Sequence, residues 1–117
     1  MTIDVLCMES KLNWRKLLKK AFQLNLTPHV DVAENYDTAM QKIKLKRYDL
    51  IVLSSPEESY FKIYDAIQEI PHGNVIIFST TDYYAAEAKK KDIPFYILWD
   101  AIDNIATIAD TYRIASK

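Results

Sequence analysis

Serine, threonine and glutamate side chains follow several short apolar runs of this sequence, at the points where predicted strands end. Glu9 and Ser10 follow the first run. Ser54 and Ser55 follow the third run, and three hydroxyl residues at 79–81 follow the fourth. Such hydroxyls can bind a small anion beside helix ends, or accept a transferred group when a base activates them. Helix capping by the same side chains is the structural alternative.

Five short runs rich in Val, Ile and aromatic residues predict the strands that position these side chains. They cover residues 3–8, 30–33, 50–53, 75–78 and 95–99. Several are apolar on both faces, which is typical of parallel strands buried on both sides.

Amphipathic segments alternate with the strands and predict helices. The first has a stripe of Trp14, Leu17, Leu18, Ala21 and Phe22, with a basic outer face of Lys11, Arg15, Lys16, Lys19 and Lys20. Later stripes are Ala39, Met40 and Ile43 within 37–47, then Tyr60, Ile63, Tyr64 and Ile67, and finally Ile102, Ile105, Ala106, Ala109 and Tyr112, with a short helix at 83–90. Ser55 to Glu58 is typical of a capping box, and Asp100 of an N-cap for the last helix.

Strict alternation of strands and helices predicts an α/β fold. We expect residues 1–117 to form one flavodoxin-like, doubly wound (βα)5 domain with five parallel strands in the order 2-1-3-4-5. In this architecture ligands bind at the carboxyl ends of the strands, where the hydroxyl and acidic residues fall.

The amino-acid composition excludes several classes of protein. The 117 residues carry 15 basic and 16 acidic side chains, which argues against a nucleic-acid binder that relies on an overall positive field. A single cysteine excludes an internal disulfide framework. No apolar run approaches the length of a membrane span, and the first ten residues lack a basic signal region. We therefore expect a cytoplasmic domain without direct membrane or nucleic-acid binding.

Cys7 lies near the end of the first predicted strand and is a second candidate nucleophile. A doubly wound domain with a cysteine there resembles the phosphocysteine subunits of sugar phosphotransferase systems. The following residues contain no glycine and put Glu9 beside the thiol, which favours an inert buried cysteine. His29 and His72 have no partners at metal-ligand spacing, so no metal site is predicted. Gly73 precedes a strand and does not form a phosphate loop.

Two stretches carry a resemblance to a known family. Residues 32–40, VAENYDTAM, and residues 47–53, RYDLIVL, resemble the second strand, second helix and third strand of the receiver domain of bacterial two-component response regulators. The resemblance covers the whole chain. It implies a phosphorylation pocket with an acidic pair that holds Mg²⁺, an aspartate that accepts the phosphoryl group, a Ser or Thr, and a Lys.

Aligned by strand, three of the pocket positions depart from the family's residues, namely Ser10, Ser54 and Trp99. Glu9 and Ser10 fall at the acidic pair, Ser54 at the phosphoacceptor, Ser79 at the hydroxyl and Trp99 at the lysine. A carboxylate accepts a phosphoryl group because it is ionised, and because Mg²⁺ and lysine neutralise the developing charge. These departures predict that phosphorylation is lost, that no cofactor is held, and that the chain is not an enzyme.

The resemblance also implies a switch and an interface. Ser79 and Tyr96 match the hydroxyl and the aromatic that move together in family members that switch. Receivers commonly bind partners through the fourth helix and fifth strand, where this sequence has several aromatic residues. The candidates are Tyr83, Tyr84, Phe95, Tyr96 and Trp99.

We therefore predict a phosphorylation-independent pseudo-receiver that acts through protein–protein contacts with a signalling component or output domain, and that can form a homodimer. The basic face of the first helix is either a solvated surface or a site for an acidic partner. Two alternatives stay open. One is a phosphoryl acceptor that uses Ser54 or Cys7, and the other is a sensor of a small anion at the strand ends.

Overall fold

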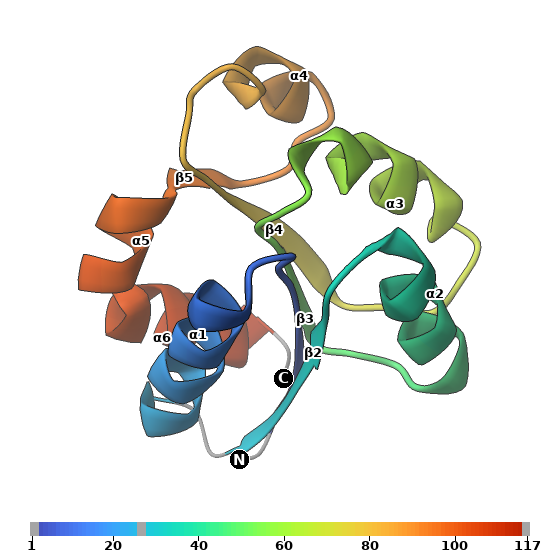
Figure 1. The fold of residues 1–117 in the computed structure, drawn as a ribbon. Helices are drawn as coiled ribbons and strands as arrows, with labels where there is room; N and C mark the ends of the chain where they lie inside the picture. Colours follow the sequence, from blue (N-terminus) through green and yellow to red (C-terminus); the bar gives the residue numbers. More distant parts are fainter. Residues whose placement is uncertain (1–2, 26–27, 116–117) are drawn as a thin grey trace.

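Five parallel strands form the centre of the computed structural model, which describes residues 3–25 and 28–115. The strands are β1 (Ile3–Met8), β2 (Pro28–Ala33), β3 (Leu50–Leu53), β4 (Asn74–Ser79) and β5 (Phe95–Ile97). Their order in the sheet is β2-β1-β3-β4-β5 (Figure 1). This arrangement confirms the predicted doubly wound fold.

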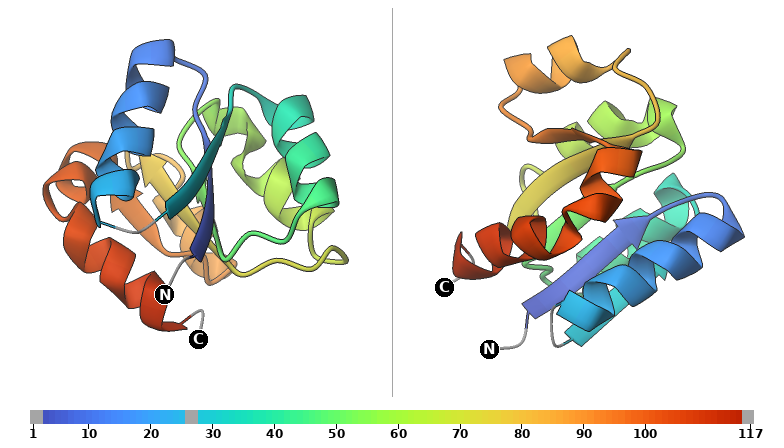
Figure 2. Two further views of the ribbon diagram at one scale, coloured as in Figure 1. Left: turned by 90° about the horizontal axis from the view of Figure 1, so that it is seen from below. Right: turned by 90° about the vertical axis from the view of Figure 1, so that its left-hand side faces the viewer.

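Helices cover both faces of the sheet (Figures 1 and 2). On one face lie α1 (Leu12–Asn25), α5 (Leu98–Asp103) and α6 (Ile105–Ala115). On the other lie α2 (Tyr36–Leu45), α3 (Tyr60–Ala66), which follows a 3-10 turn η1 (Glu57–Ser59), and α4 (Ala85–Lys90).

Alternation along each strand divides the core into two layers. Val5 and Cys7 of β1 pack toward α1, α5 and α6, whereas Leu6 and Met8 pack toward α2 and α3. All four side chains are fully buried, because both faces of the sheet are covered. This burial explains why the strands appear in the sequence as continuous apolar runs.

Four local predictions are wrong. The fifth strand ends at Ile97, so Trp99 lies in a helix, and the last helix is divided at Asn104 into α5 and α6. Asp100 lies inside α5 and does not cap it, because the helix already begins at Leu98. In α1, Leu18 and Phe22 are buried as predicted, but Leu17 faces solvent.

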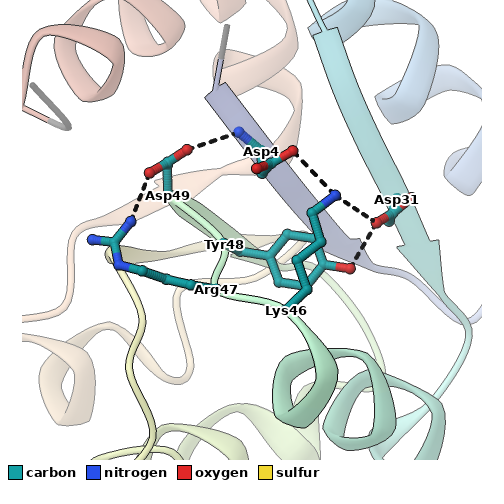
Figure 3. Close-up of polar contacts among 6 residues, drawn as sticks. All are labelled: Asp4, Asp31, Lys46, Arg47, Tyr48 and Asp49. Carbon is teal, nitrogen blue, oxygen red and sulfur yellow. Dashed lines mark hydrogen bonds and ion pairs between the residues drawn. The ribbon is translucent and has the colours of Figure 1, made fainter.

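A polar cluster lies at the amino-terminal ends of β1 and β3, at the opposite end of the sheet from the predicted site (Figure 3). Its members are Asp4, Asp31, Lys46, Arg47, Tyr48 and Asp49. The Lys46 ammonium lies 3.1 Å from Asp4 and 3.6 Å from Asp31, and the Tyr48 hydroxyl donates to Asp31 at 2.7 Å. Burial acts to raise the pKa of Asp31, but the Tyr48 hydrogen bond and the Lys46 charge outweigh it and lower that pKa. The cluster joins β1, β2 and the loop before β3.

Gly73 is required by a close approach of two backbone segments. Its amide donates to the Tyr48 carbonyl at 2.7 Å. A Cβ atom at residue 73 would lie 2.2 Å from the carbonyl oxygen of Asp49, so only glycine fits here. Within residues 3–25 and 28–115, none of the helices is long and apolar enough to cross a membrane.

Candidate functional site

A pocket of about 330 Å³ lies at the carboxyl ends of β1, β3 and β4. Its walls are formed by Glu9, Lys11, Trp14, Ser54, Ser55, Glu57, Glu58, Thr80, Tyr84 and Leu98. The strand register explains why distant residues meet here. Met8 pairs with Leu53, so the next residues along the chain, Glu9 and Ser54, are neighbours.

Glu9 is the centre of the polar network in this pocket. Its side chain is only 2% exposed, yet both carboxylate oxygens accept hydrogen bonds. The Ser54 hydroxyl donates to Oε1 at 2.7 Å. The Ser55 hydroxyl and the Lys11 backbone amide, the latter at 2.9 Å, donate to Oε2. A buried carboxylate is tolerated when donors of this kind surround it.

Ser10 and Ser55 join the loops that follow β1 and β3. The Ser10 amide donates to the Ser55 hydroxyl oxygen at 2.9 Å, and the two hydroxyl oxygens lie 2.8 Å apart. Arg15 in α1 donates to the carbonyls of Glu9 and Ser10 at 3.1 and 3.0 Å. The predicted capping box is therefore wrong, because the Ser55 hydroxyl bonds to Glu9 and Ser10 and makes no cap contact with η1.

Ser79 belongs to a second network on the other side of the pocket. Its hydroxyl and that of Thr80 each donate to the Glu57 carboxylate at 3.3 Å. The Thr81 amide donates to the Ser79 hydroxyl oxygen at the same distance. Ser79 itself is fully buried, so Thr80 forms the pocket wall.

Tyr60 connects the ends of β3 and β4 beneath the pocket. Its side chain is fully buried, and its hydroxyl donates to the carbonyl of Ser54 and, at 3.2 Å, to that of Phe78. Burial raises the pKa of the Tyr60 hydroxyl, so the group stays protonated and keeps both bonds. These bonds hold the backbone at the predicted acceptor position.

Trp99 is not brought together with the other predicted pocket residues. It is 58% exposed, and its ring packs edge-on against Trp14 at 4.9 Å between centroids. Because α5 begins at Leu98, successive side chains turn by about 100°, and Leu98 takes the buried position at the pocket wall. Trp99 therefore does not line the pocket, although the resemblance places it at the position of the family's lysine. The cation at the pocket is Lys11, from the loop after β1.

The residues present do not fit the Mg²⁺ ion that receiver chemistry would require. Both oxygens of Glu9 already accept hydrogen bonds, and the second acidic position is a serine. In the part of the chain that the structure describes, no group of three His, Cys, Asp or Glu side chains is placed to hold a metal ion.

The predicted interface aromatics separate into exposed and packed residues. Tyr83 is 79% exposed, whereas Tyr84 is half-buried and packs against Tyr60 at 5.6 Å between centroids. The rings of Tyr83 and Tyr84 also pack against each other, with 4.8 Å between their centroids. Phe95 is half-buried on the α4 side of the sheet.

Tyr96 points to the other side of the sheet, toward α6. Its hydroxyl lies 3.1 Å from that of Tyr112, and its ring packs edge-on against Phe78. The pKa of the Tyr112 hydroxyl is raised, mainly by burial and secondly by the hydrogen bond with Tyr96. In this conformation Tyr96 is packed and makes no hydrogen bond with Ser79.

The remaining reactive side chains have structural surroundings. Cys7 is fully buried. The pKa of its thiol is raised, mainly by this burial and secondly by the negative charge of Glu9. His29 is exposed on β2. His72 makes a 2.7 Å hydrogen bond with the Ile70 carbonyl.

Sequence reasoning missed the roles of Lys11 and Tyr60. Lys11 was assigned to the basic outer face of the first helix and Tyr60 to an apolar stripe, because both fit those periodic patterns. The predicted pocket position of Ser54, directly after β3, was the signal that could have found Tyr60. Tyr60 lies six residues after Ser54, just beyond the single turn of η1, and this places its hydroxyl within reach of the Ser54 carbonyl.

Comparison with known proteins supports the fold. No protein-family model and no curated protein matches the sequence. A response regulator from Thermotoga maritima has a similar structure, with a TM-score of 0.77 at 20% identity over 96% of this chain and 98% of that one. The response regulator protein TrrA from the same organism was solved in complex with Mg²⁺ and BeF. It has a TM-score of 0.69 at 21% identity, over 93% of this chain and 99% of that one. The chain therefore has the flavodoxin-like fold of response regulator receivers.

Proposed function

We propose that this chain is a receiver-like signalling module of the cytoplasm that acts through protein contacts and not through phosphorylation or catalysis. The observation that carries the proposal is the state of Ser54. This residue follows β3, where the resemblance places the acceptor aspartate, and its hydroxyl donates to a buried carboxylate that also binds Ser55 and Lys11. The hydroxyl is held in a structural network.

Charge at the pocket supports the same proposal. Three carboxylates, from Glu9, Glu57 and Glu58, line it against the single ammonium of Lys11. A phosphoryl donor is anionic, and its transfer needs positive charge at the oxygens of the moving group. This pocket offers mainly negative charge, which also disfavours the alternative of a small-anion sensor.

A second candidate is phosphoryl transfer to Ser54 with Glu9 as the base. The distance of 2.7 Å between the hydroxyl and the carboxylate is short enough for proton transfer. Against it, Glu9 is already bound by two other donors, and Ser54 is only 4% exposed, so an incoming donor would have to displace these contacts.

Beryllofluoride binding separates the two candidates. We expect NMR spectra of the protein to stay unchanged when Mg²⁺ and beryllofluoride are added. Ser54→Ala serves as the matched control, because it removes the hydroxyl but leaves the backbone. Saturable shifts in the native protein that disappear in Ser54→Ala would support the second candidate and contradict the first.

Tyr83 is the best anchor for a protein partner on the α4 side. Its ring is largely exposed and is held from below by Tyr84, and an ordered aromatic provides contact area at low entropy cost. Because Tyr84 packs on the buried Tyr60, replacing Tyr83 and Tyr84 together would disturb the fold. Tyr83→Ala alone should reduce partner capture from the source cell by at least about fivefold (~1 kcal/mol), with exposed Lys89→Ala in α4 as the control.

A further inference from the structure

The face formed by α1 and α5 carries apolar side chains that the domain does not cover. Leu17 and Leu24 of α1 are 41% and 76% exposed, and Trp99 of α5 is 58% exposed. Leu17 and Leu24 are seven residues apart, so they lie on one stripe of the helix. Trp14 links this stripe to α5 through its ring contact with Trp99. The right-hand view of Figure 2 looks onto α1, α5 and α6 together.

Charges of opposite sign flank this apolar stripe on its two sides. Lys16 and Lys20 are exposed on α1, while Asp100 and Asp103 are exposed on α5, with Asp103 one turn after Trp99. Among residues 3–25 and 28–115, no ion pair is formed by any of these four side chains. The face is therefore basic at one side, apolar at the middle and acidic at the other side.

We propose that this face binds a second copy of the chain in a symmetric dimer. A two-fold axis through the apolar stripe places the basic side of each copy against the acidic side of the other. Trp99 and Leu17 then lie at the centre of the interface, and the four charged side chains of each copy lie at its rim. The arrangement is self-complementary, which a single unlike partner would not require.

The dimer goes beyond the function proposed above and does not depend on the loss of phosphorylation. It also uses a different surface from Tyr83, which lies next to α4 on the other side of the sheet. The helix α1 has 14 residues and is therefore about 21 Å long, and neighbouring helices pack about 10 Å apart. A face of this size is at the low end for specific interfaces, so the dimer dissociates on dilution.

Paired charge reversals test the proposed geometry by sedimentation equilibrium at low and high protein concentration. Variant one carries Lys16→Glu and Lys20→Glu, and variant two carries Asp100→Lys and Asp103→Lys. Each should weaken self-association by at least about tenfold, since like charges then face each other in both halves of the dimer. Mixing the two variants should restore dimerisation, because each rim again pairs opposite charges.

The control is Lys89→Glu with Lys90→Glu, which reverses two exposed lysines on α4 and should leave self-association unchanged. Restoration in the mixture requires two folded proteins, so it excludes misfolding as the cause of the single-variant losses. A native chain that stays monomeric at all concentrations overturns the proposal, and so does a dimer that either variant leaves intact or that the control disrupts. Failure of mixing to restore the dimer would also overturn the two-fold arrangement.

Discussion

Replacing Glu9 by Gln tests whether the carboxylate at the centre of the pocket is structural. Three donors meet the two oxygens of Glu9, from Ser54, Ser55 and the Lys11 amide. A glutamine keeps one acceptor oxygen and replaces the other by an NH₂ group. The fixed Lys11 amide needs the oxygen, and Ser55 donates to that same oxygen. The NH₂ group must therefore face the Ser54 hydroxyl, which then loses its acceptor.

The expected cost follows from these contacts. One hydrogen bond to a charged group is lost, at about 1.5–3 kcal/mol, and one hydroxyl is left without its acceptor, at about 1–3 kcal/mol when buried. Ser54 is only 4% exposed, but its hydroxyl oxygen can accept a hydrogen bond from the new NH₂ group, which reduces the second contribution. We therefore expect Glu9→Gln to lower the free energy of unfolding by about 2–4 kcal/mol.

Urea unfolding followed by circular dichroism measures this change, with Glu58→Gln as the matched control. Glu58 lines the same pocket, but its side chain is exposed and makes no side-chain hydrogen bond within the described part of the chain, so its substitution should change stability by less than about 0.5 kcal/mol. A Glu9→Gln protein as stable as the native one would refute the structural role. A more stable variant would indicate that Glu9 is retained for binding, at a cost in stability.

Three other substitutions or probes check separate parts of the structure. Gly73→Ala should destabilise the fold by about 2–3 kcal/mol in urea, because its Cβ would collide with the Asp49 backbone. Tyr48→Phe should cost about 1 kcal/mol at pH 7 through its bond to Asp31. Because folding lowers the pKa of Asp31, this difference should be constant above about pH 4 and shrink as acid protonates the carboxylate. Cys7 should resist a thiol reagent until the protein is unfolded, since it is fully buried; labelling of the native protein would contradict its assigned place.

The fold could be predicted because burial on both faces of a parallel sheet leaves a direct trace in the sequence. The apolar runs at residues 3–8 and 50–53 coincide with β1 and β3. The adjacency of Glu9 and Ser54 also followed, since residues after neighbouring parallel strands must meet at one edge.

Side-chain direction at the site could not be predicted in the same way. The run at residues 95–99 is apolar throughout, and nothing in it marks where strand changes to helix. Because α5 begins at Leu98, the period changes from two to 3.6 residues, and Trp99 turns outward to Trp14. The Ser55 hydroxyl was misassigned for a related reason. A local capping pattern competed with a contact to Glu9, 46 residues away along the chain, and local patterns do not report distant partners.

Intact mass spectrometry after incubation with acetyl phosphate and Mg²⁺ tests the central claim most directly. We expect the mass of the native protein to stay unchanged. Ser54→Asp should also stay unmodified, because Trp99 faces away from the pocket and no lysine takes the position after β5. A native protein that gains the mass of one phosphoryl group, and loses that gain in Ser54→Ala, would contradict the account.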